Sequence, residues 1–279
     1  MVSVGLTAVL LILTLFAGYL YYQNRYLVKD IIKNKEIESM KESFLATLVH
    51  DLKTPTNAQL NTLNLLRNEA FGKLNSRQQE MITLTQESCK YMSNLIGTIM
   101  ETYNYDAGTI HLVKSKFDVV KLIENLCEEA DILAQNNKLK IVFENNLFDS
   151  AIYADKLQIE RVINNLLSNA INYSFADTVV RVIVNQDKDS INVSVVNISK
   201  PIPEQELQTI FDKYKKTKFS HFNKTSTGLG LYLSKRVIEL HNGKIYAKSF
   251  ADGKCVFGFI IPINSASEVK SSKQDMMTT

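Results

Sequence analysis

The sequence predicts an α+β protein in three parts: an N-terminal transmembrane helix, a helical hairpin that dimerises into a four-helix bundle, and an α/β sandwich. Three observations support this prediction. Val2–Tyr22 contains no charged residue, apolar residues recur at helical spacing on both sides of a turn near Gly72, and strand-like and helix-like runs alternate from Phe117 onward. With 279 residues, the chain is long enough for about two globular domains.

Residues 1–22 are predicted to cross a membrane once. A helix over Val2–Tyr22 is about 30 Å long, which matches the thickness of the hydrocarbon core. No Lys or Arg precedes this run, whereas Arg25, Lys29 and Lys33 follow it. The positive-inside bias therefore predicts a single-pass protein of the cytoplasmic (inner) membrane, with the rest of the chain in the cytoplasm. A cleaved signal peptide is the competing interpretation, and the missing basic n-region argues against it.

Residues 23–43 mix both charges with scattered apolar side chains and are predicted to form a helical linker. Residues 44–107 then form the hairpin. In its first helix Phe44, Leu48 and Leu52 recur every four positions and line one face.

The hairpin turn is expected at residues 71–76. Ser76 and Gln79 have the spacing of a capping box at the start of the second helix, which carries a heptad-like apolar series up to Tyr103. Because one hairpin has a small core, we expect two copies to pair as a homodimer. A monomeric hairpin packed on the next domain is the alternative.

Residues 108–264 are predicted to form the sandwich, and residues 265–279 a polar tail. Strand-like runs alternate with helix-like runs, which predicts one sheet with helices on a single face. The helices are expected at 119–135, 155–173 and 228–241, and the strands at 138–145, 178–185, 190–197, 243–249 and 255–262.

Composition excludes several classes of function. The net charge of +3 and the lack of a dense basic run give no reason to expect a nucleic-acid partner. The three cysteines, Cys89, Cys127 and Cys255, are far apart and show no Cys-x-x-Cys spacing, so neither a zinc site nor a disulfide framework is expected.

His50 is the first candidate for chemistry. The apolar face of its helix leaves His50 on a different, solvated face, and Asp51 follows at once. A neutral imidazole is a nucleophile, and a carboxylate that holds the proton of the other ring nitrogen makes it a better one. His50 could therefore carry a phosphoryl group, whereas the bland alternative is a surface histidine without a chemical role.

The run from Phe44 to Pro55 resembles the H-box of sensor histidine kinases, in which His, an acid, two residues, Thr or Asn, and Pro follow one another. The resemblance implies that His50 is the phosphorylated residue and Asp51 the general base. It also implies that Thr54 positions the water that dephosphorylates a partner.

Asn165 and Asn169 are four residues apart and share one face of a predicted helix. Their amide oxygens could ligate Mg2+, which takes oxygen ligands and bridges phosphates, although an Asn-rich helix can also be merely solvated. The run resembles the N-box of the GHKL-type ATP-binding domain. This implies that Asn165, Asn169, Asn172 and Tyr173 bind ATP, with Asn172 where many relatives have Lys, Arg or His.

Gly228 and Gly230 open a predicted helix whose free amides could bind phosphate. A two-glycine loop alone is weak evidence, because glycine also marks ordinary turns. The run resembles the G2 box, with Ser226 in place of its usual first glycine, and residues 215–226 resemble the ATP lid. The resemblance implies nucleotide contacts from Lys216, Thr227, Gly228, Leu229, Gly230 and Leu231.

Asn197 stands where the family's G1 box has an aspartate that accepts a hydrogen bond from the adenine amino group. An Asn oxygen can accept the same bond, but without the charge that strengthens it. Both glycines of the usual G1 box are also replaced. We therefore expect reduced nucleotide affinity.

The motifs together predict a membrane-anchored two-component sensor histidine kinase. It would bind ATP and Mg2+, phosphorylate itself on His50 and pass the phosphoryl group to an aspartate of a response regulator receiver domain. The alternative is a pseudokinase with weak ATP binding that acts as a phosphatase or a scaffold for the regulator. A mechanical ATPase of the GHKL type is disfavoured because it would not need the H-box.

Overall fold

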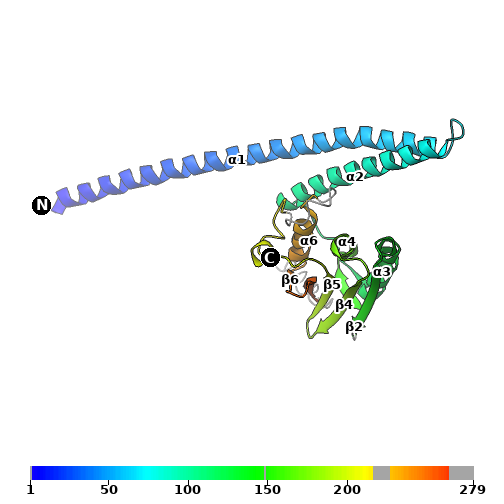
Figure 1. The fold of residues 1–279 in the computed structure, drawn as a ribbon. Coiled ribbons are helices and arrows are strands. Elements are labelled where there is room, and N and C mark those ends of the chain that lie inside the picture. The colour runs from blue at the N-terminus through cyan, green and yellow to red at the C-terminus, as the bar shows by residue number, and fades with distance from the viewer. Residues whose placement is uncertain (1, 148, 216–226, 264–279) are drawn as a thin grey trace. The chain divides into compact units, whose positions relative to one another are not determined.

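The computed structural model describes residues 2–147, 149–215 and 227–263 (Figure 1), and within the first helix it leaves some side chains undescribed. The chain divides into two compact units, Met1–Met100 and Glu101–Thr279.

The first unit is built on two long helices, α1 (Val2–Arg67) and α2 (Ser76–Asp106), which confirm the predicted hairpin. α1 continues through Pro55 without ending there. A polar ladder joins the two helices. Gln86 is buried, donates from Nε2 to Asn64 Oδ1 at 2.9 Å and accepts at Oε1 from the Arg67 guanidinium at 3.3 Å. Because a buried amide without partners is costly, this ladder favours one alignment of the helices.

The turn between the helices corrects one sequence prediction. The N–H of Asn75 donates to Gln78 Oε1 and the N–H of Gln78 donates to Asn75 Oδ1, both at 2.9 Å. The capping box is therefore Asn75 with Gln78 rather than Ser76 with Gln79. Both pairs have the required spacing and suitable residue types, so the sequence pattern alone could not separate them.

The predicted membrane span lies within α1, and most of its side chains fall outside the described residues. Among the side chains that the structure describes, no helix combines the length and the apolar character needed to cross a membrane.

The second unit contains a five-stranded sheet in the order β2-β4-β5-β7-β6, with β2 parallel to β4 and the other neighbours antiparallel. Helices α3, α4 and α6 pack beside one another over the sheet (Figure 1). This confirms the predicted sandwich. The elements are α3 (Val119–Asn136), β2 (Lys140–Asn146), α4 (Lys156–Tyr173), β4 (Val179–Asp187), β5 (Ser190–Ile198), α6 (Gly230–Leu240), β6 (Lys244–Ser249) and β7 (Lys254–Pro262).

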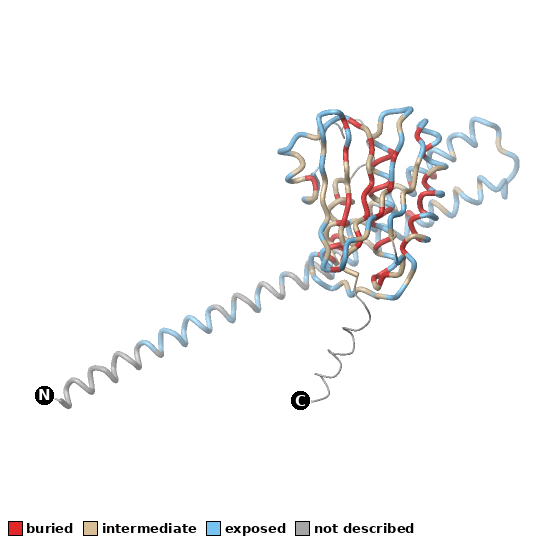
Figure 2. Tube along the Cα trace, turned by 90° about the horizontal axis from the view of Figure 1, so that it is seen from below, coloured by how far each residue is buried: buried red, intermediate tan, exposed pale blue. Residues whose placement is uncertain are grey.

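The core of this unit lies between the sheet and its helices. In Figure 2 the buried residues run along the central strands and along one side of the covering helices. The sequence of α4 explains why a helix forms against the sheet. Asp155 caps its N-terminus by accepting a hydrogen bond from the N–H of Gln158, and its apolar residues recur at three- and four-residue steps. The buried residues of α4 are Ile159, Val162, Ile163, Leu166, Leu167, Ala170 and Ile171.

Three short elements were not predicted. β1 (Ser115–Asp118) and β3 (Ala151–Ala154) pair as a separate two-stranded sheet, and α5 (Glu204–Leu207) follows β5. Each has four residues, which is too short for a periodic pattern to distinguish it from a loop.

His241, just after α6, is buried and ties α6 to the start of α4. Its Nε2 accepts from the N–H of Asp155 at 3.0 Å, and its Nδ1 donates to the carbonyl of Val237 at 2.8 Å. This pairing requires the neutral ring. Burial lowers the pKa of His241 below its usual value of 6.5, against the smaller opposing effect of the hydrogen bond to Val237.

Mild acid is expected to destabilise the second unit through His241. Because its pKa is lower in the folded state, its contribution to the free energy of unfolding is complete above pH 6.5 and is lost as the pH falls from 6.5 through the folded pKa. Urea unfolding at a series of pH values measures this loss. In a His241→Gln variant the pH dependence over this range should be flatter, and equal slopes in the two proteins would contradict the assignment.

Candidate functional site

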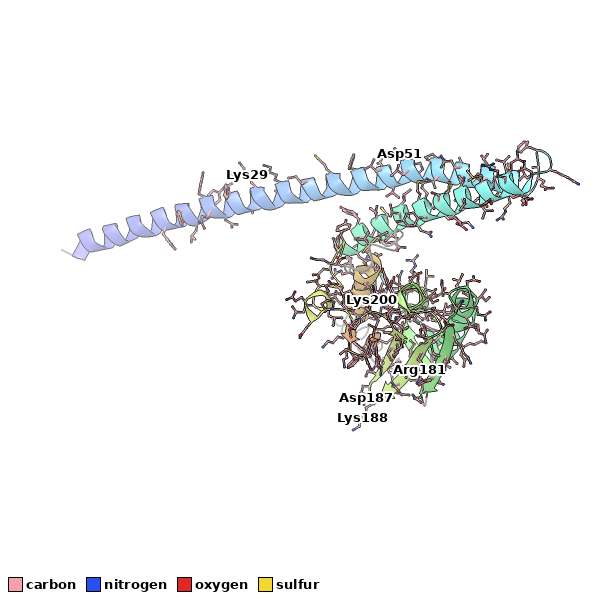
Figure 3. All side chains as sticks on the ribbon, viewed as in Figure 1. Lys29, Asp51, Arg181, Asp187, Lys188 and Lys200 are labelled. Carbon is pink, nitrogen blue, oxygen red and sulfur yellow. The ribbon has the colours of Figure 1, made fainter. Side chains whose placement is uncertain are left out.

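α1 carries His50, Asp51 and Thr54 on its exposed surface, and Asp51 is labelled on this helix in Figure 3. His50 Nδ1 lies 3.3 Å from Asp51 Oδ1, and the two side chains are 79% and 66% exposed. Thr54 Oγ1 donates to the carbonyl of His50 at 3.0 Å. The structure therefore brings these three predicted residues together.

The contact between His50 and Asp51 determines which ring nitrogen can react. A carboxylate only accepts hydrogen bonds, so the proton of a neutral His50 ring lies on Nδ1. Nε2 then carries the lone pair, on a side chain that is largely exposed. The arrangement presents Nε2 as a nucleophile for a group that arrives from solvent or from another domain.

α4 places Asn165 and Asn169 one turn apart, and both are partly buried. Asn165 Nδ2 donates to Ser234 Oγ of α6 at 2.9 Å, so Asn165 ties the two helices together. The side chain of Asn169 makes no hydrogen bond to any residue that the structure describes, so its amide is available to a ligand. The sequence interpretation missed Ser234, although its place one turn after Gly230 was a usable signal.

The remaining predicted residues of α4 lie at its C-terminal end. Asn172 is exposed and donates from Nδ2 to Ser168 Oγ at 3.3 Å. Tyr173 is partly buried and is the last residue of α4.

Gly230, the first residue of α6, contacts the Asn165 side chain closely. A Cβ added to Gly230 would collide with Oδ1 of Asn165. A larger residue at position 230 would therefore displace the Asn165 side chain. Leu229 is buried and Leu231 is partly buried.

Gly228 joins the two ends of the predicted lid. Its φ is +71°, and an added Cβ would lie 2.9 Å from the carbonyl oxygen of Lys215 and from the carbonyl carbon of Tyr214. The N–H of Tyr214 donates to the carbonyl of Gly228 at 3.0 Å. Thr227 Oγ1 accepts from the N–H of Leu229 at 3.2 Å, which orders the turn into α6. Lys216 and residues 217–226 lie outside the described residues.

Asn197 lies near the end of β5 and is 3% exposed. Its Nδ2 donates to Ser174 Oγ, just after α4, at 3.3 Å. Lys200, labelled in Figure 3, follows this strand. α4, which carries Asn169, contacts both β5, which carries Asn197, and α6, which Gly228 precedes.

The side chains at this site suit an anion and a hard cation. α6 begins at Gly230, and the first N–H groups of a helix lack intrahelical partners and can bind an anion. Among the described residues, no cluster of three or more His, Cys, Asp or Glu could hold a metal. The amide oxygens of Asn165 and Asn169 are of the kind that Mg2+ accepts as ligands.

Asp106, at the end of α2, adds a cluster that the sequence interpretation missed. Within the second unit it accepts hydrogen bonds from Lys213 Nζ and from the Tyr232 hydroxyl. Burial raises the pKa of Asp106, but the hydrogen bonds from Lys213 and Tyr232 outweigh burial and hold this pKa below its usual value. Burial and the bond to Asp106 raise the pKa of Tyr232 to about 12. Asp106 thus links residues on both sides of the predicted lid.

Two family models match the chain. Residues 40–108 match the His Kinase A (phospho-acceptor) domain, and residues 154–265 match the histidine kinase-, DNA gyrase B- and HSP90-like ATPase domain. The first match contains His50, Asp51 and Thr54, and the second contains the candidate residues of α4, β5 and α6.

Curated relatives include two bacterial sensors. Sensor protein CzcS of Cupriavidus metallidurans is 28% identical over 228 residues, covering 80% of this chain and 46% of CzcS. Sensor histidine kinase YvrG of Bacillus subtilis is 25% identical over 223 residues, covering 79% of this chain and 38% of YvrG. The chain thus spans less than half the length of these two relatives.

Solved structures share the fold. Full-length ShkA in complex with AMPPNP has a TM-score of 0.69 at 22% identity. The match covers 80% of this chain and 46% of the ShkA chain. The Acinetobacter baumannii histidine kinase AdeS has a TM-score of 0.56 at 20% identity. The match covers 77% of this chain and 98% of the AdeS chain.

Proposed function

Because the chain belongs to the sensor histidine kinases of two-component systems, we propose that it transfers the γ-phosphoryl group of ATP to its own His50. From there the group passes to an aspartate of a response regulator receiver domain. The observation that supports this best is the His50–Asp51 pair, which holds a proton at Nδ1 and leaves Nε2 as the nucleophile.

The second unit is proposed to bind ATP. Asn197 Oδ1 accepts a hydrogen bond from the adenine amino group, and the backbone at Gly228 and the start of α6 contacts the phosphates. The oxygens of Asn165 and Asn169 hold Mg2+. When bound, Mg2+ neutralises phosphate charge, which is the main requirement of phosphoryl transfer besides positioning. AMPPNP in the ShkA structure supports nucleotide binding in a related fold.

In the transfer step, the lone pair of His50 Nε2 attacks the γ-phosphorus while the bond to the bridging oxygen breaks and ADP leaves. The Nδ1 proton stays on the ring and is hydrogen-bonded to Asp51, whose carboxylate stabilises the positive charge that develops on the ring. The phosphoryl group then moves from Nε2 to the carboxylate of the regulator. Thr54 is proposed to orient the water that hydrolyses the aspartyl phosphate of the regulator, which releases inorganic phosphate in the phosphatase reaction.

The active form is proposed to be a homodimer. Several large apolar side chains of α1 and α2 are exposed in the single chain, and a second hairpin would cover them. These side chains are Phe44, Leu48, Leu52, Met81, Leu84 and Ile99. The uncharged run Val2–Tyr22 and the basic residues after it support anchoring in the cytoplasmic membrane, with both units in the cytoplasm.

Incubation of the full chain with Mg2+ and γ-labelled ATP tests this function. Label that is lost in acid and stable in alkali identifies phosphohistidine. Absence of such label, in a chain that still removes phosphate from a phosphorylated receiver domain, would favour the pseudokinase alternative, which the uncharged Asn197 motivates.

A further inference from the structure

Ser174 caps the C-terminus of α4 and contacts Asn197 of β5. Its Oγ donates to the carbonyl of Ala170 at 2.5 Å and lies 3.3 Å from Asn197 Nδ2. The next N–H, of Phe175, donates to the carbonyl of Ile198 at 2.9 Å. Two hydrogen bonds therefore hold this end of α4 against the end of β5, and Asn197 is nearly completely buried between its neighbours.

The hydroxyl of Ser174 determines which way the Asn197 amide faces. A hydroxyl has one proton, and Ser174 gives it to the carbonyl of Ala170. Towards Asn197 it can therefore only accept a hydrogen bond. The amide nitrogen of Asn197 must face Ser174, and the amide oxygen must face the other way. This orientation follows from the single proton of the Ser174 hydroxyl.

We propose that Ser174 is a positioning residue that makes Asn197 selective for adenine over guanine. With its nitrogen held by Ser174, Asn197 presents only an acceptor to the base. Adenine offers an amino donor at its six-position, whereas guanine has a carbonyl there, and two facing acceptors repel. An amide that could turn round would accept guanine by donating from its nitrogen. The inference rests on the proposed ATP-binding function and deepens it.

The contact with Ser174 would let Asn197 bind adenine in place of the aspartate of the usual G1 box. An aspartate has two acceptor oxygens, so either orientation suits adenine. An asparagine has one acceptor and one donor, so its orientation must be fixed. Ser174 therefore matters in this chain because residue 197 is Asn, and it should become dispensable when that residue is changed to Asp.

The test measures the dissociation constants of ATP and GTP, each with Mg2+, for the full chain and its variants. Ser174→Ala should lower the ATP-to-GTP preference about tenfold, the effect of one misplaced hydrogen bond. Ser174→Thr keeps the hydroxyl and should restore the preference. In an Asn197→Asp background, Ser174→Ala should change the preference less than twofold. Ser194→Ala, which removes a buried hydroxyl of β5 away from Asn197, is the matched control and should leave the preference unchanged.

The outcomes separate this inference from the proposed function. An unsubstituted chain that binds no ATP overturns both. ATP binding with an unchanged preference in Ser174→Ala overturns the inference alone. An equal loss in the Asn197 and Asn197→Asp backgrounds also overturns it, because Ser174 would then act only on stability. Thermal unfolding of each variant identifies a folding defect. If Ser174→Ala does not fold, Ser174→Thr still tests the inference, because a lowered preference in a variant that keeps the hydroxyl overturns it.

Discussion

Replacing His50 by Gln is expected to abolish phosphorylation of the chain. The Gln side chain approximates the size of the ring, but its amide nitrogen has no available lone pair and cannot attack phosphorus. Label from γ-labelled ATP should fall more than about a thousandfold, as when other enzymes lose their nucleophile. ATP affinity should be unchanged, because the candidate ATP residues lie in the second unit and His50 lies in the first. Gel-resolved label and nucleotide titration measure the two effects.

His111→Gln provides the matched control, since His111 is also exposed but lies outside both groups of candidate residues. It should retain full labelling. Asp51→Asn should retain binding and lose about a hundredfold or more in rate, because the amide cannot hold the proton of Nδ1 as a carboxylate does. Acid-labile label that persists in His50→Gln would place the acceptor on another residue.

Replacing Gly228 by Ala is expected to weaken ATP binding and to destabilise the second unit. Alanine at φ +71° costs about 1 to 2 kcal/mol. The added Cβ would also lie 2.9 Å from backbone atoms of Tyr214 and Lys215, which cannot move aside as a flexible side chain can. The hydrogen bond between Tyr214 and Gly228 should weaken, so the two ends of the lid separate. Thermal unfolding and ATP titration measure the losses.

Gly108→Ala separates crowding from backbone strain. Gly108 has a similar φ of +68°, but an added Cβ would have nothing within 4 Å. We expect Gly108→Ala to lose stability through strain alone and to keep its ATP affinity. Equal loss of ATP affinity in the two variants would show that the contact between Gly228 and Tyr214 does not matter for binding.

Periodicity predicted most of the fold because each main element buries one face. α4 has apolar residues at helical steps, and β4 and β5 alternate along the central sheet, so local pattern and tertiary packing agree. β1 and β3 are too short for any period, and the capping box at Asn75 competed with an equally good one at Ser76. These differences have local causes.

Only part of the candidate site could be predicted from the sequence. The predicted His50–Asp51 contact joins adjacent residues, so the sequence alone could indicate it. The contacts of Ser234 with Asn165 and of Tyr232 with Asp106 join residues 69 and 126 positions apart. These pairs depend on how α4, α6 and the end of α2 pack, and the sequence indicates at most that Ser234 lies one turn after Gly230. The residues that support the site were therefore the ones that sequence reasoning missed.

The cluster at Asp106 gives the second unit a sensitivity to ionic strength. Lys213 and Asp106 form an ion pair whose side chains are about one-third exposed, 37% and 31%, so dissolved ions reach it. At physiological salt the screening length is about 8 Å, and exposed pairs weaken further as salt rises. Lys213 and Tyr232 lie on either side of the lid. Added salt should therefore weaken the contacts by which Asp106 joins these two residues. The nucleotide affinity of this protein should therefore depend on the electrolyte around it, even though none of these three residues is proposed to contact the nucleotide.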